Sequence, residues 1–196
     1  DSSVFPGSAE NEAGSLCMKD SDGDGFGDAE LSGEELALGV VAGQDCDDSS
    51  GSIAPNVTEQ AADLIDANCD GQELCYIDSD GDGYGSSIAT ITSSNLNCDG
   101  ANESVNTTDC DDNSAVTYPG AAYLDSVSDC MKDTDLDGYG DISPPSATLL
   151  LAGTDCDDSN AAANTGQVEL CSTDFDDDCD GFVNDDSAIL SLIHIS

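Results

Sequence analysis

The sequence predicts a series of small, irregular tandem repeats, made mostly of loops with short β-strands or hairpins and little helix. Three observations lead to this prediction. The same aspartate- and glycine-rich motifs recur in a fixed order along the 196 residues. The chain contains ten cysteines, and only 5% of its residues are aromatic, with no Trp. A chain with so few large apolar side chains is not expected to bury a large core.

The charge balance excludes several classes of partner. The chain has 43 acidic residues against two basic ones, which gives a formal net charge of -41. Nucleic acids and anionic membrane surfaces attract basic proteins, so neither is expected as a partner. No apolar run is long enough to insert into a bilayer. Of the acidic residues 34 are Asp, which is favoured in turns and in metal loops with oxygen ligands.

Three motifs define the repeat, and we call them elements one, two and three. Element one reads Asp-x-Asp-x-Asp-Gly-aromatic-Gly and begins at Asp20, Asp78 and Asp133. Element two reads Asp-Cys-Asp-Asp and occupies residues 45–48, 109–112 and 155–158. Element three begins seven residues after element two, at Pro55, Pro119 and Thr165.

The order of these motifs predicts one partial repeat followed by three complete ones. The predicted segments are the end of a preceding repeat (1–15), a long repeat (16–73), a short repeat (74–128), a second long repeat (129–187) and a tail (188–196). The tail shares no motif with the repeats. We interpret it as a non-native, adapter-like sequence, with a short terminal strand as the alternative. The only histidine, His194, lies in it.

Element one has the ligand spacing of an EF-hand calcium loop. Alternate residues of such a curled loop point their oxygens at one ion, and calcium takes roughly six to eight oxygen ligands. In the first repeat the glutamate expected at position twelve is replaced by Leu31. The missing ligands must therefore come from another segment, and element two is the obvious donor. A solvated acidic turn is the alternative for any single loop.

The predicted cofactor is calcium, with several ions per chain. The candidate ligands, which include the backbone carbonyls of the aromatic residues, fall at equivalent positions of the three repeats. They are Asp20, Asp22, Asp24, Phe26, Asp28, Asp45 and Asp48; Asp78, Asp80, Asp82, Tyr84, Asp109 and Asp112; and Asp133, Asp135, Asp137, Tyr139, Asp141, Asp155 and Asp158. We expect Asp109 and Asp112 to complete the site of the second repeat, which has Ser86 at position nine.

The long repeats contain a second acidic loop after element three. Its candidate ligands are Asp66, Asn68 and Asp70 in one repeat, and Asp176, Asp178, Asp180 and the carbonyl of Phe182 in the other, with Asp174 and Asp185 in reserve. A glutamate, Glu59 or Glu169, precedes each loop by seven residues. The sequence leaves open whether these glutamates close a metal site or cap a turn.

The cysteines predict disulfides in an oxidising, extracellular setting, because their number is even. The sequence contains no CxxC pair, the spacing that would indicate a zinc site. Correspondence between repeats predicts the pairs Cys17–Cys46 and Cys130–Cys156, and Cys171 and Cys179 are expected to pair because they bracket the last acidic loop. For the cysteines in and just before the middle repeat we favour Cys98–Cys110 and Cys69–Cys75. Apolar strips at residues 36–42, 88–92 and 147–152 are expected to form short strands. The aromatic residues at loop position seven are expected to pack on these strips.

The combined motifs resemble a known family. Asp-x-Asp-Gly-Asp-Gly-Tyr-Gly, Asp-Cys-Asp-Asp, Pro-Gly-Ala and Asp-x-Asp-Cys-Asp-Gly, over about residues 1–187, resemble the metal-binding Asp-rich repeats of bacterial surface proteins, the MopE-like repeats. The loops are also similar to thrombospondin type 3 calcium repeats. The resemblance implies calcium- and disulfide-stapled repeats. The family's name implies copper, but copper prefers imidazole or sulfur ligands, and the only histidine is in the tail.

These observations favour a structural role outside the cell. The leading hypothesis is a calcium-binding spacer or adhesive stalk of a larger secreted or cell-surface protein, in contact with neighbouring repeats, surface glycans or proteins. The alternative is an adhesin that binds carbohydrate or protein through its calcium ions. A paired-carboxylate hydrolase is disfavoured, because carboxylates that hold calcium are ionised and a glycosidase needs one protonated acid. We therefore expect no enzymatic activity. A disordered acidic chain is the remaining alternative.

Overall fold

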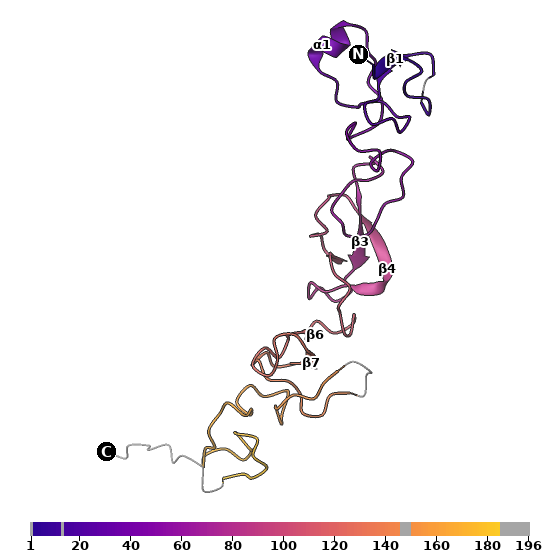
Figure 1. Ribbon diagram of the computed structural model, residues 1–196. Helices are drawn as coiled ribbons and strands as arrows, with labels where there is room; N and C mark the ends of the chain where they lie inside the picture. Colours follow the sequence, from indigo (N-terminus) through magenta and orange to yellow (C-terminus); the bar gives the residue numbers. More distant parts are fainter. Residues whose placement is uncertain (1, 13, 146–149, 185–196) are drawn as a thin grey trace, which may run out of the picture. The chain divides into compact units, whose positions relative to one another are not determined.

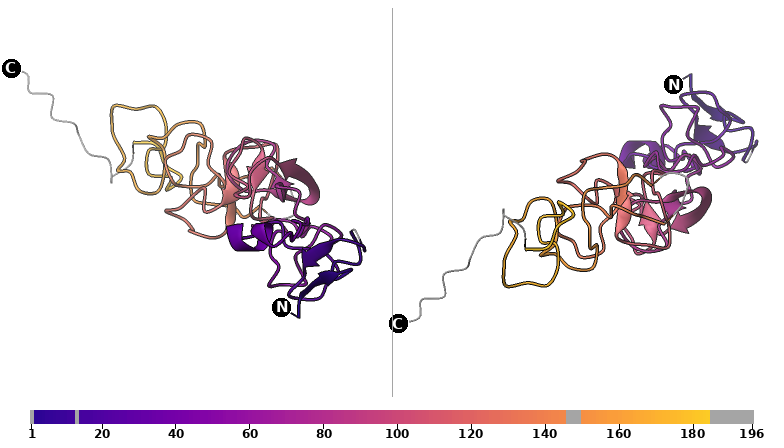
Figure 2. Two further views of the ribbon diagram at one scale, coloured as in Figure 1. Left: turned by 90° about the horizontal axis from the view of Figure 1, so that it is seen from above. Right: turned by 90° about the horizontal axis from the view of Figure 1, so that it is seen from below.

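The computed structural model describes residues 2–12, 14–145 and 150–184, and the chain divides into two compact units. One unit contains residues up to 77 together with 88–105, and the other contains residues 78–87 and those from 106 onward. Both units consist mostly of irregular chain with short strands (Figures 1 and 2). The single helix in the described residues has five residues. The predicted fold class, small irregular repeats rich in loops, is confirmed.

The first unit contains a two-stranded and a three-stranded sheet. Strand β1 (Val4–Pro6) pairs antiparallel with β2 (Cys17–Lys19). The larger sheet has the order β4-β3-β5, with β3 (Glu73–Ile77) at its centre beside β4 (Ser86–Ser93) and β5 (Glu103–Ser104). The short helix α1 (Gly33–Ala37) begins with a capping box, which satisfies two N–H groups at its start.

The second unit repeats the small hairpin of the first. Strand β6 (Thr117–Pro119) pairs antiparallel with β7 (Cys130–Lys132), and Pro119 lies opposite Cys130. Pro6 lies opposite Cys17 in the same register of the first unit. Equivalent sequences therefore fold into equivalent hairpins immediately before element one.

The apolar strips form different structures in different repeats. Residues 88–92 lie in strand β4, as predicted, but residues 36–42 include the end of α1. The strip at 147–152 lies partly outside the described residues. Among the aromatic residues at position seven, Phe26 is buried, whereas Phe182 is 66% exposed. Tyr84 stacks on Tyr118, which lies outside the strips, with ring centroids 5.3 Å apart. Packing of these aromatic residues on the strips stays a prediction.

The described core is small and more polar than apolar. Twelve hydrophobic residues are buried, half of them alanines, against thirteen buried polar or charged residues. The largest apolar side chains of this core are Met18, Phe26 and Met131. Apolar burial on this scale contributes little, so hydrogen bonds and disulfides must supply much of the stability.

The structure corrects all five predicted disulfides. The observed pairs are Cys46–Cys69, Cys75–Cys98, Cys110–Cys130 and Cys156–Cys179, while Cys17 and Cys171 are free thiols. The prediction failed because correspondence identifies equivalent cysteines but not the segment that each side chain faces. Each observed bridge spans 20 to 23 residues, a loop length whose closure stabilises by roughly 3 kcal/mol in the chain-entropy model.

Candidate metal centres

Hydrogen bonds from the backbone curl each element-one loop around its first aspartate. In the first repeat the two oxygens of Asp20 accept the N–H groups of Gly23 at 2.7 Å and Gly25 at 3.2 Å. Asp22 accepts the N–H of Asp24 at 3.1 Å through one oxygen. The other two loops repeat this pattern. In consequence, oxygens of Asp20, Asp22 and Asp24 lie within 4.8 Å of one another, as do their equivalents in the second repeat.

Backbone contacts bring element two beside element one in every repeat. The first aspartate of element two donates its N–H to the carbonyl of the glycine at loop position eight. These bonds join Asp45 to Gly27 at 2.9 Å, Asp109 to Gly85 at 3.4 Å and Asp155 to Gly140 at 2.8 Å. A Cβ atom on Gly43 would collide with the backbone of Gly27. Sequence reasoning did not assign this role to position eight, although its recurring glycine was a visible signal.

Eight carboxylate oxygens of these two elements are buried and accept no hydrogen bond from the described residues. They belong to Asp22, Asp24 and Asp45; Asp80, Asp82 and Asp109; and Asp135 and Asp155. In the third repeat the remaining member, Asp137, accepts the side-chain amide of Asn164 at 2.6 Å. A buried anionic oxygen without a partner costs free energy. The recurrence of these oxygens at loop positions three and five and in element two fits a hard cation held by oxygen ligands.

Burial, and then the charge accumulated in each centre, raises the pKa of one aspartate or more in every repeat. Burial, together with the nearby charges of Asp24 and Asp22, raises the pKa of Asp45 to about 6. Burial and the neighbouring aspartates likewise raise the pKa of Asp82 to about 6 and that of Asp155 to about 7. Two carboxylates about 4.8 Å apart repel each other by roughly 3 kcal/mol at an effective dielectric constant near 20. A divalent cation would convert this repulsion into attraction.

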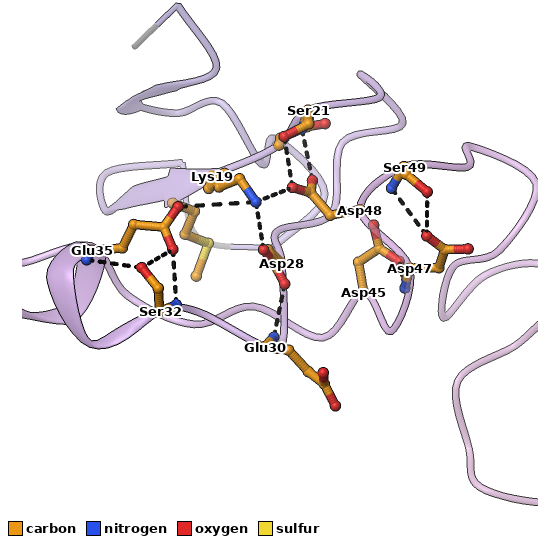
Figure 3. A network of polar contacts seen from close by, with 12 residues as sticks. Lys19, Ser21, Asp28, Glu30, Ser32, Glu35, Asp45, Asp47, Asp48 and Ser49 are labelled. Carbon is orange, nitrogen blue, oxygen red and sulfur yellow. Dashed lines mark hydrogen bonds and ion pairs between the residues drawn. The ribbon is translucent and has the colours of Figure 1, made fainter.

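The last aspartate of element two is bonded to element one. Asp48 accepts the N–H and the hydroxyl of Ser21 at 2.6 and 2.7 Å (Figure 3). Asp112 accepts the same two groups of Ser79 at 3.0 and 2.8 Å, and Asp158 those of Thr134. In the second repeat the structure therefore places Asp109 among the loop aspartates and Asp112 at the loop backbone. We call the contact between the last aspartate of element two and the serine or threonine at loop position two the staple.

Both lysines of the chain lie directly before element one. The Lys19 ammonium is 2.7 Å from Asp28, 2.9 Å from Asp48 and 4.0 Å from Glu35 (Figure 3). Hydrogen bonds to Asp28 and Asp48 raise the pKa of Lys19 above its usual range. Lys132 pairs with Asp158. In the first repeat the candidate ligand at position nine, Asp28, is thus already paired with a cation of the chain.

The remaining candidates of the element-one loops are also placed. The N–H groups of Phe26, Tyr84 and Tyr139 each donate to the aspartate at position five, at 2.8 Å. This contact fixes the turn, and metal binding by their carbonyls stays a prediction. Asp141, the equivalent of Asp28, accepts the N–H of Ser143 at 2.7 Å.

The second acidic loops of the long repeats are curled in the same way. Asp66 accepts the N–H groups of Asp70 and Gly71, and Asp176 those of Asp180 and Gly181. Among the further candidates, Asn68 accepts the N–H of Asp70, and Asp180 accepts that of the exposed Phe182. One oxygen of Asp178 is buried, and Asp174 is exposed. Asp185 lies outside the described residues.

The two glutamates cap these loops. Glu59 accepts the N–H groups of Ala67 and Asn68, both at 3.3 Å. Glu169, fully buried, accepts those of Asp177 at 2.8 Å and Asn184 at 2.6 Å. Of the two roles that the sequence left open, metal ligand or turn cap, the geometry of both glutamates matches the turn cap.

Glu59 has two further acidic neighbours that sequence reasoning missed. Oxygens of Glu59, Asp63 and Glu73 lie within 4.8 Å of one another. Burial, and then the charges of Glu59 and Asp63, raise the pKa of Glu73. These residues do not follow the Asp-x-Asp-x-Asp spacing, and only their spatial proximity identifies them.

Comparison with known families supports metal binding by the repeats. The family model of the MopE repeat, described as “Putative metal-binding motif”, matches residues 45–73, 109–123 and 155–185. These three segments carry the MopE-like repeat, and they contain element two and the cysteine that follows its first aspartate. No curated protein and no solved structure matches the chain. Within the described residues, no helix has the length and apolar character needed to cross a membrane.

Proposed function

We propose that the chain is a calcium-binding repeat segment of an extracellular protein, in which ions hold elements one and two together. The observation that carries the proposal is the set of buried, unpartnered carboxylate oxygens that recurs in three repeats. In each repeat these oxygens come from two segments, with their aspartates at least twenty positions apart in sequence. An ion shared by both segments would close a loop in a domain that has little apolar core.

The donor chemistry favours calcium over copper, although the family model carries copper in its name. The centres offer carboxylate oxygens, which suit hard cations. Copper favours imidazole or sulfur, and eight of the ten cysteines are committed to disulfides. Magnesium requires a smaller octahedron and keeps more of its water. Sites with several carboxylates are therefore expected to prefer calcium.

The proposed setting and role are extracellular and structural. Four disulfides support an oxidising compartment. Calcium concentrations outside cells match weak sites, and dissociation constants on the order of 0.1–1 mM are expected for extracellular modules. We propose a spacer or stalk without catalytic activity, because the clustered carboxylates are assigned to ions rather than to proton transfer.

Calorimetric titration of the full chain with calcium, magnesium and copper(II) tests the proposal. We expect calcium to bind at each of the three centres, more tightly than magnesium does at the same centre. The variant Asp45→Asn should lose one calcium ion per chain, because it removes the charge and the unpartnered oxygen while keeping the acceptor for Asp47.

A matched control is the neighbouring residue. Asp47→Asn removes the same charge, but Asp47 bonds only to Ser49 among the described contacts of its side chain. Its calcium count should be unchanged. Equal ion loss in both variants, or tight copper binding that calcium does not displace, would contradict the proposal.

A further inference from the structure

We infer that Glu59, Asp63 and Glu73 form an additional cation site in the first long repeat, separate from the centres of elements one and two. The site would take a hard divalent cation, with calcium as the probe. The inference does not depend on calcium binding by the element-one loops, because it uses none of their residues.

A buried oxygen without a partner marks this site. Glu73 is the first residue of β3, and its side chain is completely buried. One of its oxygens accepts the N–H groups of Ala62 and Leu74, both at 3.1 Å. The other oxygen accepts no hydrogen bond in the described structure. The carboxylate is therefore anchored on one side and unsatisfied on the other, which a cation would correct.

The two other carboxylates are anchored as well. Both oxygens of Glu59 accept backbone N–H groups, and Asp63 accepts the N–H of Ile65 at 3.0 Å. The three carboxylates thus converge to within 4.8 Å while backbone contacts limit their separation. Like charges held together in this way need a positive partner.

The described residues supply no positive partner here. The chain has two lysines and no arginine, and the ammonium groups of Lys19 and Lys132 pair with carboxylates near elements one and two and in helix α1. A cavity of about 210 Å3 adjoins the cluster and is lined by Glu59, Glu73 and the polar residues Asn68 and Thr92, among others. A cavity of this size accommodates an ion with several water molecules.

The third repeat shows that the loop does not need this cluster in order to fold. At the equivalent positions Glu169 is kept, but Asp63 is replaced by Thr173 and Glu73 by Val183. There Glu169 still caps the loop, and the Thr173 hydroxyl donates to Asp177 at 2.5 Å. Because the cap forms without the two extra acids, the extra acids of the first repeat are assigned to the ion.

The test counts calcium ions bound to the full chain by calorimetry. Glu73→Gln keeps an acceptor for Ala62 and Leu74 but removes the charge, and it should lose one ion per chain. Glu103→Gln is the matched control. Glu103 lies in β5 of the same sheet and is bonded to Ser93 and Gly100, so its variant should keep every ion.

Two further variants keep the test decisive if Glu73→Gln folds poorly. Asp63 is exposed, so Asp63→Asn should fold normally and should weaken or lose the same ion. The double variant Thr173→Asp with Val183→Glu should add one ion to the third repeat. An unchanged ion count in Asp63→Asn and in a folded Glu73→Gln would overturn the inference, and would mean that Glu73 is neutralised by a proton instead.

Failure of this site is distinguishable from failure of the proposed function. The variants Asp45→Asn, Asp109→Asn and Asp155→Asn leave the Glu73 cluster intact. If the triple variant still binds one calcium ion that Glu73→Gln removes, the inference holds without the proposed centres. If the single variants lose ions but Glu73→Gln does not, the inference fails and the proposed function stands.

Discussion

The first and second repeats build the same centre with different charges beside it. Lys19 precedes element one in the first repeat and pairs with Asp48, whereas Ile77 stands at the equivalent position of the second repeat. The staple nevertheless forms in both, with Ser21 bonded to Asp48 and Ser79 to Asp112. Backbone and hydroxyl donors therefore assemble the centre, and the lysine only compensates charge.

Lowering the pH should have the largest effect, and it should affect these two repeats equally. The pKa is about 6 for Asp45 in the first repeat and about 6 for Asp82 in the second, but about 7 for Asp155 in the third. Protons compete with calcium for these carboxylates. Relative to about pH 8, the calcium affinity at pH 5 should therefore be about tenfold lower in the first two centres and about a hundredfold lower in the third. Calorimetry on variants with a single intact centre measures this.

The metal-free chain should show the opposite dependence on pH. These aspartates have folded-state pKa values above their ordinary value, so the folded state binds more protons than the unfolded state. In chelator the free energy of unfolding should therefore rise as the pH falls from about 8 to about 5. Thermal unfolding in chelator checks the sign. Stability that falls with the pH in this range would show that these carboxylates are not the dominant titrating groups.

Exchanging the lysine between the two repeats should have the next largest effect. Lys19→Met leaves Asp28 and Asp48 without their ammonium, which should lower the free energy of unfolding in chelator by about 1–3 kcal/mol. Calcium should then bind the first centre severalfold more tightly, because no ammonium repels the ion. Denaturant unfolding and calorimetry measure the two changes.

The reciprocal variant Ile77→Lys is the control for this exchange. It should weaken calcium binding in the second centre, so that the calcium affinity of the second centre becomes closer to that of the first. If Lys19→Met also weakened calcium binding, the lysine would be needed to position the ligands, and the comparison drawn above would be wrong.

Hydrogen exchange should reveal the smallest difference, at two matched amides. The Ser21 amide donates to Asp48, which Lys19 also holds, and the Ser79 amide donates to Asp112. After chelation the Ser79 amide should lose several times more protection than the Ser21 amide, since one partly buried ion pair contributes about 1 kcal/mol. The Thr134 amide, next to the Lys132–Asp158 pair, should behave like Ser21. Equal loss at all three would contradict the role given to the lysines.

Much of the candidate site could be predicted because its residues follow a short spacing rule. The Asp-x-Asp-x-Asp-Gly pattern identified the loop aspartates, and the missing ligand at position twelve indicated that element two would be recruited. We expected Asp109 and Asp112 to complete the site together, and their different contacts could not be predicted in this way. The Asp109 N–H donates to the carbonyl of Gly85, while the Asp112 carboxylate accepts the N–H of Ser79. Both contacts depend on the path by which the chain comes back to the element-one loop.

The sequence by itself determined the recurring motifs, the loop-rich fold class and the acidic loops, because all of these depend on local composition and spacing. Only the tertiary structure decided the disulfide pairs, the convergence of Glu59 with Glu73 and the pairing of Asp28 with Lys19. The physical reason is that these contacts join segments that no periodicity relates. Equivalent residues also have different neighbours, since Cys130 forms a disulfide with Cys110, whereas the equivalent Cys17 is a free thiol.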